Sequence, residues 1–332
     1  MELKPTFIKT SDKVFKESID KAREERLKRA EEEKIGIKDV IDEIIELKRN
    51  GPPKGHKIPH KAYDHFKFTY GNVITITGYS GHGKSHFIEE IITMLISFHG
   101  MKFGFYAPER KVSYSYIRMM DMIRGVKIFN DIVTEDEIFQ MAAFLNDKTM
   151  FVNSDKNRLN EEELMLFIEA FFILGCKGVL IDNVATIQKF MLDDKGGVGD
   201  FMNNLKELAS EYNANIFLVV HPTKQPEVIK QFHGSKMAGP AEFYNLCDVN
   251  IVVFYDKSCG VSSANFCKIK DEFTGREGQF DYQRNDYNNR FYSGKEDNEP
   301  WINFVKNHKS NFDIPTVPIK EYDYDNEFDT PF

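Results

Sequence analysis

GYSGHGKS, residues 78–85, matches all eight positions of the phosphate-binding loop pattern G-x-x-x-x-G-K-[ST]. The residues before it, Val73 to Thr77, read VITIT, an apolar, β-branched run that predicts a strand. The apolar residues after it recur at helical spacing and are Phe87, Ile88, Ile91, Ile92, Leu95 and Ile96. A strand, a glycine-rich loop and a helix in this order are the context that the pattern requires, so a chance glycine loop is the weaker interpretation.

The residue types of this loop predict a nucleotide site. Glycines allow several backbone N–H groups to point into one concavity around the phosphates, at the start of a helix. Lys84 supplies a positive charge for the β- and γ-phosphates, and the Ser85 hydroxyl can bind Mg²⁺. The residues expected to bind ATP and Mg²⁺ are Gly78, Ser80, Gly81, Gly83, Lys84 and Ser85, together with Asp182 from a later strand.

The composition describes a chain that can bury a large core. It has 332 residues, of which 41% are hydrophobic, and it has no run of eighteen apolar residues that could span a membrane. Its N-terminal sequence lacks the apolar stretch of a secretion signal, and its four cysteines show no C-x-x-C spacing. We therefore expect a reduced, cytoplasmic protein without structural zinc. The net charge of −8 means that any contact with nucleic acid must come from a locally basic surface.

Residues 57–295 alternate predicted strands and helices. The expected strands are 73–77, 103–107, 149–153, 178–182, 216–220 and 249–255. Near-continuous apolar strands separated by helices are typical of a parallel sheet that is covered on both faces. Three later segments, 264–270, 279–283 and 289–293, resemble short antiparallel strands. The sequence thus predicts an α/β P-loop NTPase domain with a mostly parallel central sheet and an antiparallel extension near its C-terminal end.

Two charged segments flank this domain. Residues 1–56 begin with a Lys-, Arg- and Glu-rich arm, which can be a solvated helix or a disordered segment. An apolar stripe then predicts an amphipathic helix over 37–48, which can pack on the chain's own core or on a neighbouring subunit. Residues 296–332 form a tail that ends in an acidic, aromatic tip, Glu321 to Phe332, for which disorder is the default expectation.

Polar residues follow three of the predicted strands. Asp182 ends the run VLID and is expected to support the metal. Glu109 follows the strand after the loop's helix, where it can act as a general base, although an ion pair with Arg110 is the alternative. His221 ends the run IFLVV, where it can sense the γ-phosphate, although a lone His is more often structural.

The segment after His221 is locally basic in an acidic chain. Residues 223–240, TKQPEVIKQFHGSKMAGP, carry Lys224, Lys230 and Lys236 and a single acidic residue, Glu227. Lysines and backbone N–H groups are suited to a phosphodiester backbone, so we expect single-stranded DNA to bind here. An ordinary solvated loop is the alternative.

These motifs, taken in order, resemble the ATPase domain of hexameric replicative DNA helicases of the DnaB, Twinkle and phage helicase–primase type. The segments that carry the resemblance are Gly78–Ser85, Ala107–Glu109, Leu180–Asn183, Val219–Lys224, Gly239 with Cys247–Val249, and Lys268–Gly278. The resemblance implies a RecA-like fold and a homohexameric ring with ATP between subunits. It also implies 5′→3′ movement on single-stranded DNA, with Glu109 as base and His221 as γ-phosphate sensor.

The chain departs from this family in two places. Family members usually carry Lys-x-Arg before the Phe-x-Gly turn, and the Arg acts in the neighbouring subunit's site; here the matching residues are Lys270 and Glu272. Either Lys270 and Arg276 take that role, or hydrolysis is weak. The 56 residues before the domain are also too few for a primase or collar domain, so a primase is expected on a separate chain.

The resulting hypothesis is an ATP-driven helicase motor of phage type, acting in the cytoplasm of a bacterial host. The tip that ends in Phe332 resembles tips that recruit a polymerase, primase or single-strand-binding protein. A RecA/RadA- or KaiC-like ATPase that does not unwind DNA is the nearest alternative. A weakly hydrolysing, ATP-binding assembly protein of a replication complex is another, and Glu272 favours it.

Overall fold

The computed structural model describes residues 28, 37–152, 159–184, 197–221, 233–236, 241–292 and 301. The chain divides into two units, Met1–Pro52 and Pro53–Phe332. The predicted segment boundaries after residues 56 and 295 stay predictions. No helix among the described residues is long and apolar enough to cross a bilayer.

The predicted amphipathic helix in the first unit is confirmed as α2 (Ile37–Asn50). It ends where Gly51 adopts a left-handed conformation, with φ of 72°, and donates its N–H to the Leu47 carbonyl at 2.8 Å. This is the ordinary C-terminal cap that glycine provides. Apolar side chains along α2 are 37–75% exposed, and they are Ile37, Val40, Ile41, Ile44 and Ile45.

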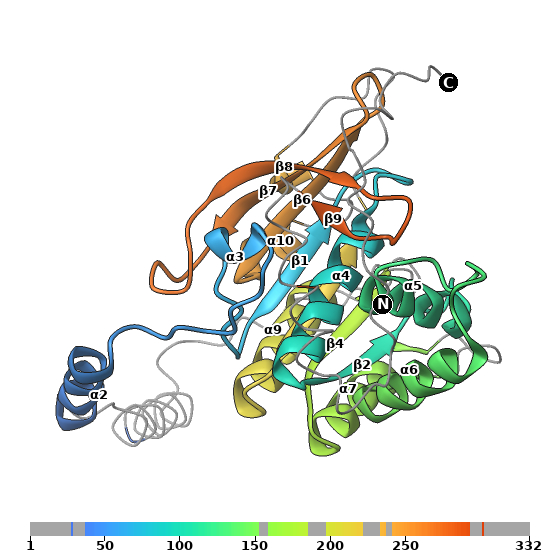
Figure 1. The fold of residues 1–332 in the computed structure, drawn as a ribbon. Helices are drawn as coiled ribbons and strands as arrows, with labels where there is room; N and C mark the ends of the chain where they lie inside the picture. Colours follow the sequence, from blue (N-terminus) through green and yellow to red (C-terminus); the bar gives the residue numbers. More distant parts are fainter. Residues whose placement is uncertain are drawn as a thin grey trace, which may run out of the picture. The chain divides into compact units, whose positions relative to one another are not determined.

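The second unit contains a nine-stranded sheet in the order β3-β2-β4-β5-β1-β6-β7-β8-β9 (Figure 1). The strands from β3 to β6 pair in parallel, and β6 to β9 pair antiparallel. The strands are β1 (Val73–Thr77), β2 (Lys102–Tyr106), β3 (Thr149–Phe151), β4 (Cys176–Asp182), β5 (Asn215–Val220), β6 (Val249–Asp256), β7 (Val261–Ile269), β8 (Gly278–Arg284) and β9 (Phe291–Tyr292). Every predicted strand is confirmed, with ends that differ by up to three residues.

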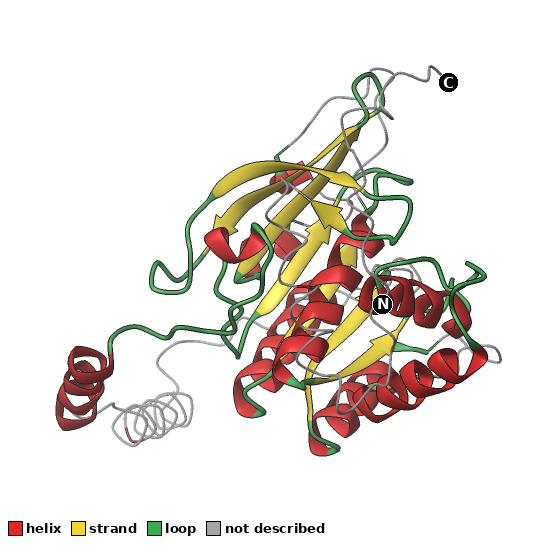
Figure 2. Ribbon diagram, viewed as in Figure 1, coloured by secondary structure: helices red, strands yellow, loops and turns green. Residues whose placement is uncertain are grey.

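Helices cover both faces of the parallel part, whereas β7 and β8 extend away from the long helices (Figure 2). The helices of this unit are α3 (Ala62–His65), α4 (Lys84–His99), α5 (Val112–Arg124), α6 (Glu135–Lys148), α7 (Glu161–Ile173), α9 (Gly197–Glu211), α10 (Glu242–Leu246) and the 3-10 turn η1 (Gly234–Lys236).

Alternate residues of each central strand enter two separate cores. Leu180 of β4 packs in the core formed with α4, α5 and α6, whereas its neighbours Val179 and Ile181 pack in the core formed with α7 and α9. Phe217 and Leu218 of β5 divide in the same way. Burial on both faces explains why these strands read as continuous apolar runs in the sequence. The predicted fold class is therefore confirmed.

Candidate active site

The glycine-rich loop connects the end of β1 to the start of α4, as its sequence predicts. Gly78 lies close to β6, because a Cβ atom at this position would come 2.2 Å from the Val253 carbonyl oxygen. Gly81 and Gly83 have φ angles of 78° and 85°, in the left-handed region that favours glycine. The loop is also tied to β6 by His82, whose Nδ1 accepts a hydrogen bond from the Tyr255 N–H at 2.9 Å.

Lys84 is buried at the first position of α4. Its ammonium donates to the carbonyl oxygens of Gly78 at 2.6 Å and Tyr79 at 2.9 Å. Burial lowers the pKa of Lys84 to about 8, and the nearby Asp182 carboxylate opposes that shift. Lys84 thus lies between the loop and the carboxylate expected to support the metal. A phosphate can replace the loop carbonyls as its partner.

The three predicted strand-end residues come together at one edge of the sheet. Glu109, Asp182 and His221 follow or end β2, β4 and β5, which are neighbours in the sheet. Asn183 connects two of them, because its side-chain Nδ2 lies 3.0 Å from Glu109 Oε2 and 3.0 Å from His221 Nε2. In the sequence, Asn183 stands only as part of the Asp-Asn motif, and nothing there indicates this bridging contact.

The environment of His221 favours the neutral imidazole. Burial is the main cause that lowers its pKa, the positive charge of Lys84 adds to that shift, and Glu109 and Asp182 oppose it. A neutral ring with an unprotonated Nε2 can accept the hydrogen bond from the Asn183 amide. This His is therefore part of a polar chain that runs from β5 to Glu109.

Arg110 does not pair with the preceding Glu109, the alternative that the sequence leaves open. Its guanidinium forms an ion pair with Glu89 of α4 and lies 3.4 Å from Asp182 Oδ2. Glu89 is 1% exposed and also pairs with Arg118, while the Ser115 hydroxyl donates to it at 3.0 Å. Glu109 is left to accept from Asn183.

Lys270 and Arg276 lie away from the loop of their own chain. Lys270 Nζ is 3.7 Å from Asp248 Oδ1, and the other oxygen of Asp248 accepts from the Val73 N–H at the start of β1. The glycine-rich loop follows the opposite end of β1, about 13 Å away at about 3.3 Å per residue. Arg276 donates its backbone N–H to the His65 carbonyl of α3.

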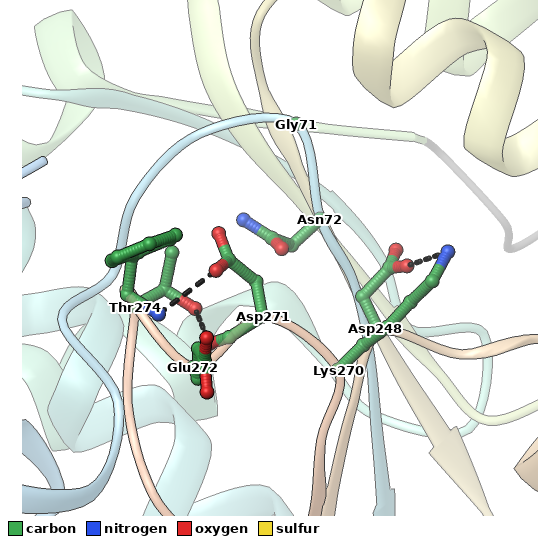
Figure 3. A pocket seen from close by; sticks show the side chains of 8 residues that line it. Gly71, Asn72, Asp248, Lys270, Asp271, Glu272 and Thr274 are labelled. Atoms are coloured by element: carbon green, nitrogen blue, oxygen red, sulfur yellow. Dashed lines mark hydrogen bonds and ion pairs between the residues drawn. The ribbon is translucent and has the colours of Figure 1, made fainter. Parts of the chain in front are cut away.

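A pocket of about 510 Å³ opens beside Lys270 (Figure 3). The residues that line it are Gly71, Asn72, Asp248, Lys270, Asp271, Glu272, Phe273 and Thr274. This set contains three carboxylates and one ammonium, so the pocket is not suited to a nucleotide triphosphate. The strand-end cluster beside the glycine-rich loop stays the predicted nucleotide site.

The predicted DNA contacts fall mostly outside the described residues. Lys224 and Lys230 are not among them, and Lys236 is described only as the end of η1, without its side chain. The acidic tip from Glu321 to Phe332 also lies outside them. These assignments stay predictions.

The sheet order and the loop between β1 and α4 define a RecA-like fold. Comparison of the sequence with family models gives no match, and comparison with curated proteins gives none either. Solved structures do match. One, described as an ATPase domain, superposes with a TM-score of 0.65 at 12% identity, over 79% of this chain and all of that domain. A DnaB-like replicative helicase, described with its interactions with primase, superposes with a TM-score of 0.62 at 12% identity, over 78% of this chain and 67% of that one. The expected resemblance is confirmed at the level of the fold.

Proposed function

We propose that this chain is an ATP-dependent replicative DNA helicase motor of phage type. The observation that carries the proposal is the meeting of Lys84, Asp182 and the Glu109–Asn183–His221 chain beside the glycine-rich loop, on a DnaB-like sheet. Mg-ATP is hydrolysed at this site, and the released energy moves the protein along single-stranded DNA and unwinds duplex DNA. The motor acts in the cytoplasm of a bacterial host.

The residues of the site fit a magnesium-bound nucleotide. The loop N–H groups and Lys84 hold the phosphates, while Ser85 at the first turn of α4 and Asp182 of β4 supply oxygens to Mg²⁺. A magnesium ion bound by these residues would neutralise phosphate charge. Glu109 takes a proton from the attacking water. His221 contacts the γ-phosphate, so release of that phosphate alters the hydrogen bonds of Asn183 to His221 and Glu109.

Lys270 and Arg276 favour an assembly of several copies. They lie at the end of the sheet opposite their own glycine-rich loop, so contact with a γ-phosphate requires the site of an adjoining subunit. We propose a hexameric ring in which they reach that site. The segment with Lys224, Lys230 and Lys236 grips single-stranded DNA in the channel, and the Glu321–Phe332 tip recruits a polymerase, primase or single-strand-binding protein.

The first test is ATP hydrolysis by the full chain with and without single-stranded DNA, followed by unwinding of a forked duplex. We expect DNA-stimulated hydrolysis and unwinding, and loss of both in Lys84→Ala. Hydrolysis without unwinding would favour the RecA/RadA- or KaiC-like alternative. ATP binding with almost no hydrolysis would instead favour an assembly protein of a replication complex, the alternative supported by Glu272.

A further inference from the structure

Glu272 stands where the resembled family carries the arginine that binds the γ-phosphate during hydrolysis. Phosphoryl transfer spreads negative charge over the oxygens of the γ-phosphate, and an arginine that binds them raises the rate by about 10³–10⁵. Glu272 carries the wrong charge for this task, and it lies in the acidic pocket beside Lys270 (Figure 3). An arginine elsewhere must meet the phosphate if hydrolysis is efficient.

Arg110 is the arginine that the structure brings to the metal-binding carboxylate. It directly follows Glu109, and its Nη2 lies 3.4 Å from Asp182 Oδ2. The Asp182 carboxylate partly opposes the burial that lowers the pKa of Lys84, which places all of these groups in one electrostatic site. Arg110 therefore reaches the site of its own chain without a contribution from another subunit.

The other half of the Arg110 guanidinium is anchored. Its Nη1 pairs with Glu89, a buried carboxylate on α4, the helix that begins at the phosphate-binding loop. Glu89 keeps a second positive partner in Arg118. If Asp182 held a magnesium ion, Arg110 Nη2 would lose that acceptor, whereas Nη1 would keep its partner Glu89. The freed Nη2 would then be a donor beside Asp182 and Lys84, the residues expected to hold the metal and the phosphates.

We propose that Arg110 stabilises the transferring γ-phosphoryl group in cis, alongside the Lys270 and Arg276 side chains that the proposed ring brings from the neighbouring subunit. The inference rests on the proposed ATPase function. In the step, the water oxygen bonds to the γ-phosphorus while the bond from that phosphorus to the β–γ bridging oxygen breaks. ADP leaves with the electron pair of that bond, Glu109 receives the water proton, and Arg110 donates hydrogen bonds without losing a proton.

The test compares affinity for Mg-ADP with affinity for Mg-ADP plus aluminium fluoride, which imitates the phosphoryl group in transit. The variants are Arg110→Ala and Arg110→Lys, and Arg118→Gln is the matched control because it alters the same Glu89 partner. We expect both Arg110 variants to keep ADP affinity and to lose the extra affinity that aluminium fluoride gives. The turnover of Arg110→Ala should fall about 10³-fold or more.

Arg110→Lys separates the catalytic role from a folding defect. It retains a positive charge beside Glu89 but lacks the planar guanidinium that can donate to two acceptors at once. Equal losses of ADP and aluminium fluoride affinity, or equal behaviour of Arg118→Gln, would show that the arginine only holds Glu89. Either result overturns the inference.

Mixed assemblies separate action in cis from action in trans. Lys84→Ala and Arg110→Ala subunits are mixed in equal amounts. Action in cis predicts no recovery of hydrolysis, because every site that retains Lys84 lacks its own Arg110. Recovery would assign Arg110 to a neighbour's site and overturn the inference. A wild-type chain that fails to hydrolyse ATP contradicts the proposed function itself, whereas unchanged hydrolysis in Arg110→Ala contradicts only the role of Arg110.

Discussion

At the scale of single residues, Asn183 connects the proposed base Glu109 to the proposed sensor His221. Its side-chain amide is 3% exposed and bridges Glu109 and His221, so neither orients alone. Removing this amide in Asn183→Ala leaves the phosphate-binding loop intact. A lost hydrogen bond of about 1–3 kcal/mol at the base corresponds to roughly 5- to 150-fold in the rate.

We expect Asn183→Ala to lower the single-turnover rate of ATP hydrolysis within that range and to leave nucleotide affinity unchanged. The control is Asn203→Ala, which changes an exposed Asn on α9. Equal rates in Asn183→Ala and the control would mean that Glu109 and His221 are positioned by other contacts.

A second residue-scale prediction concerns His86, which is buried under β9. Burial and the nearby Arg118 lower the pKa of His86 to about 3, and its Nε2 lies 2.7 Å from the Asn289 carbonyl oxygen. In the unfolded chain the His86 imidazole binds a proton below about pH 6.5, whereas in the folded chain it stays neutral until about pH 3. Its contribution to stability is therefore complete above pH 6.5 and is lost as the pH falls toward 3.

The expected loss between pH 7 and pH 5 is about 2 kcal/mol from this group. Urea unfolding at the two pH values measures it. His86→Gln should flatten the pH dependence by that amount, whereas His233→Gln, a change at an exposed His, should not. An identical pH dependence in wild type and His86→Gln would contradict the assignment.

At the scale of elements, the sheet depends on close packing between β4 and β2. Gly178 has no room for a side chain, because a Cβ atom would lie 2.3 Å from the ring of Phe103, which is 1% exposed. Gly199 on α9 is the matched control, since its nearest neighbour is the flexible Glu242 side chain at 4.0 Å.

Gly178→Ala is expected to destabilise the fold by about 1–3 kcal/mol through overpacking. Gly199→Ala should be neutral or stabilise by up to about 1 kcal/mol, because alanine loses less backbone entropy in a helix. Chemical unfolding of both variants measures the difference. If both behave alike, packing against Phe103 is not what excludes a side chain at Gly178.

The elements also show what the sequence can predict. The strand positions, and the meeting of Glu109, Asp182 and His221, could be predicted from apolar runs followed by polar residues, since parallel strands bring their carboxyl ends to one edge. The partners of Arg110 did not follow, because Glu89 and Asp182 lie 21 and 72 residues away and only side-chain geometry brings them together. The Asn183 bridge could not be predicted for the same reason, because Asn183 is 74 residues from Glu109 and 38 residues from His221 in the sequence.

At the scale of the whole molecule, the proposed ring needs a surface that holds subunits together. Helix α2 carries five apolar side chains along one stripe, and each is 37–75% exposed. An apolar stripe of this kind is stabilised by burial against another surface, at about 25 cal/mol for each Å² removed from water. We therefore predict that α2 docks on a neighbouring subunit.

Two changes test this docking in sedimentation velocity with Mg-nucleotide and an oligonucleotide present. Deleting residues 1–50 should leave smaller species. The double variant Ile41→Asp with Ile44→Asp should do the same, because it places charges in the apolar stripe without shortening the chain. The control Glu43→Gln with Glu46→Gln alters exposed polar positions of the same helix and should keep the assembly. An unchanged oligomer in the aspartate variant would show that α2 does not hold the subunits, and the contacts would then have to come from the sheet unit itself.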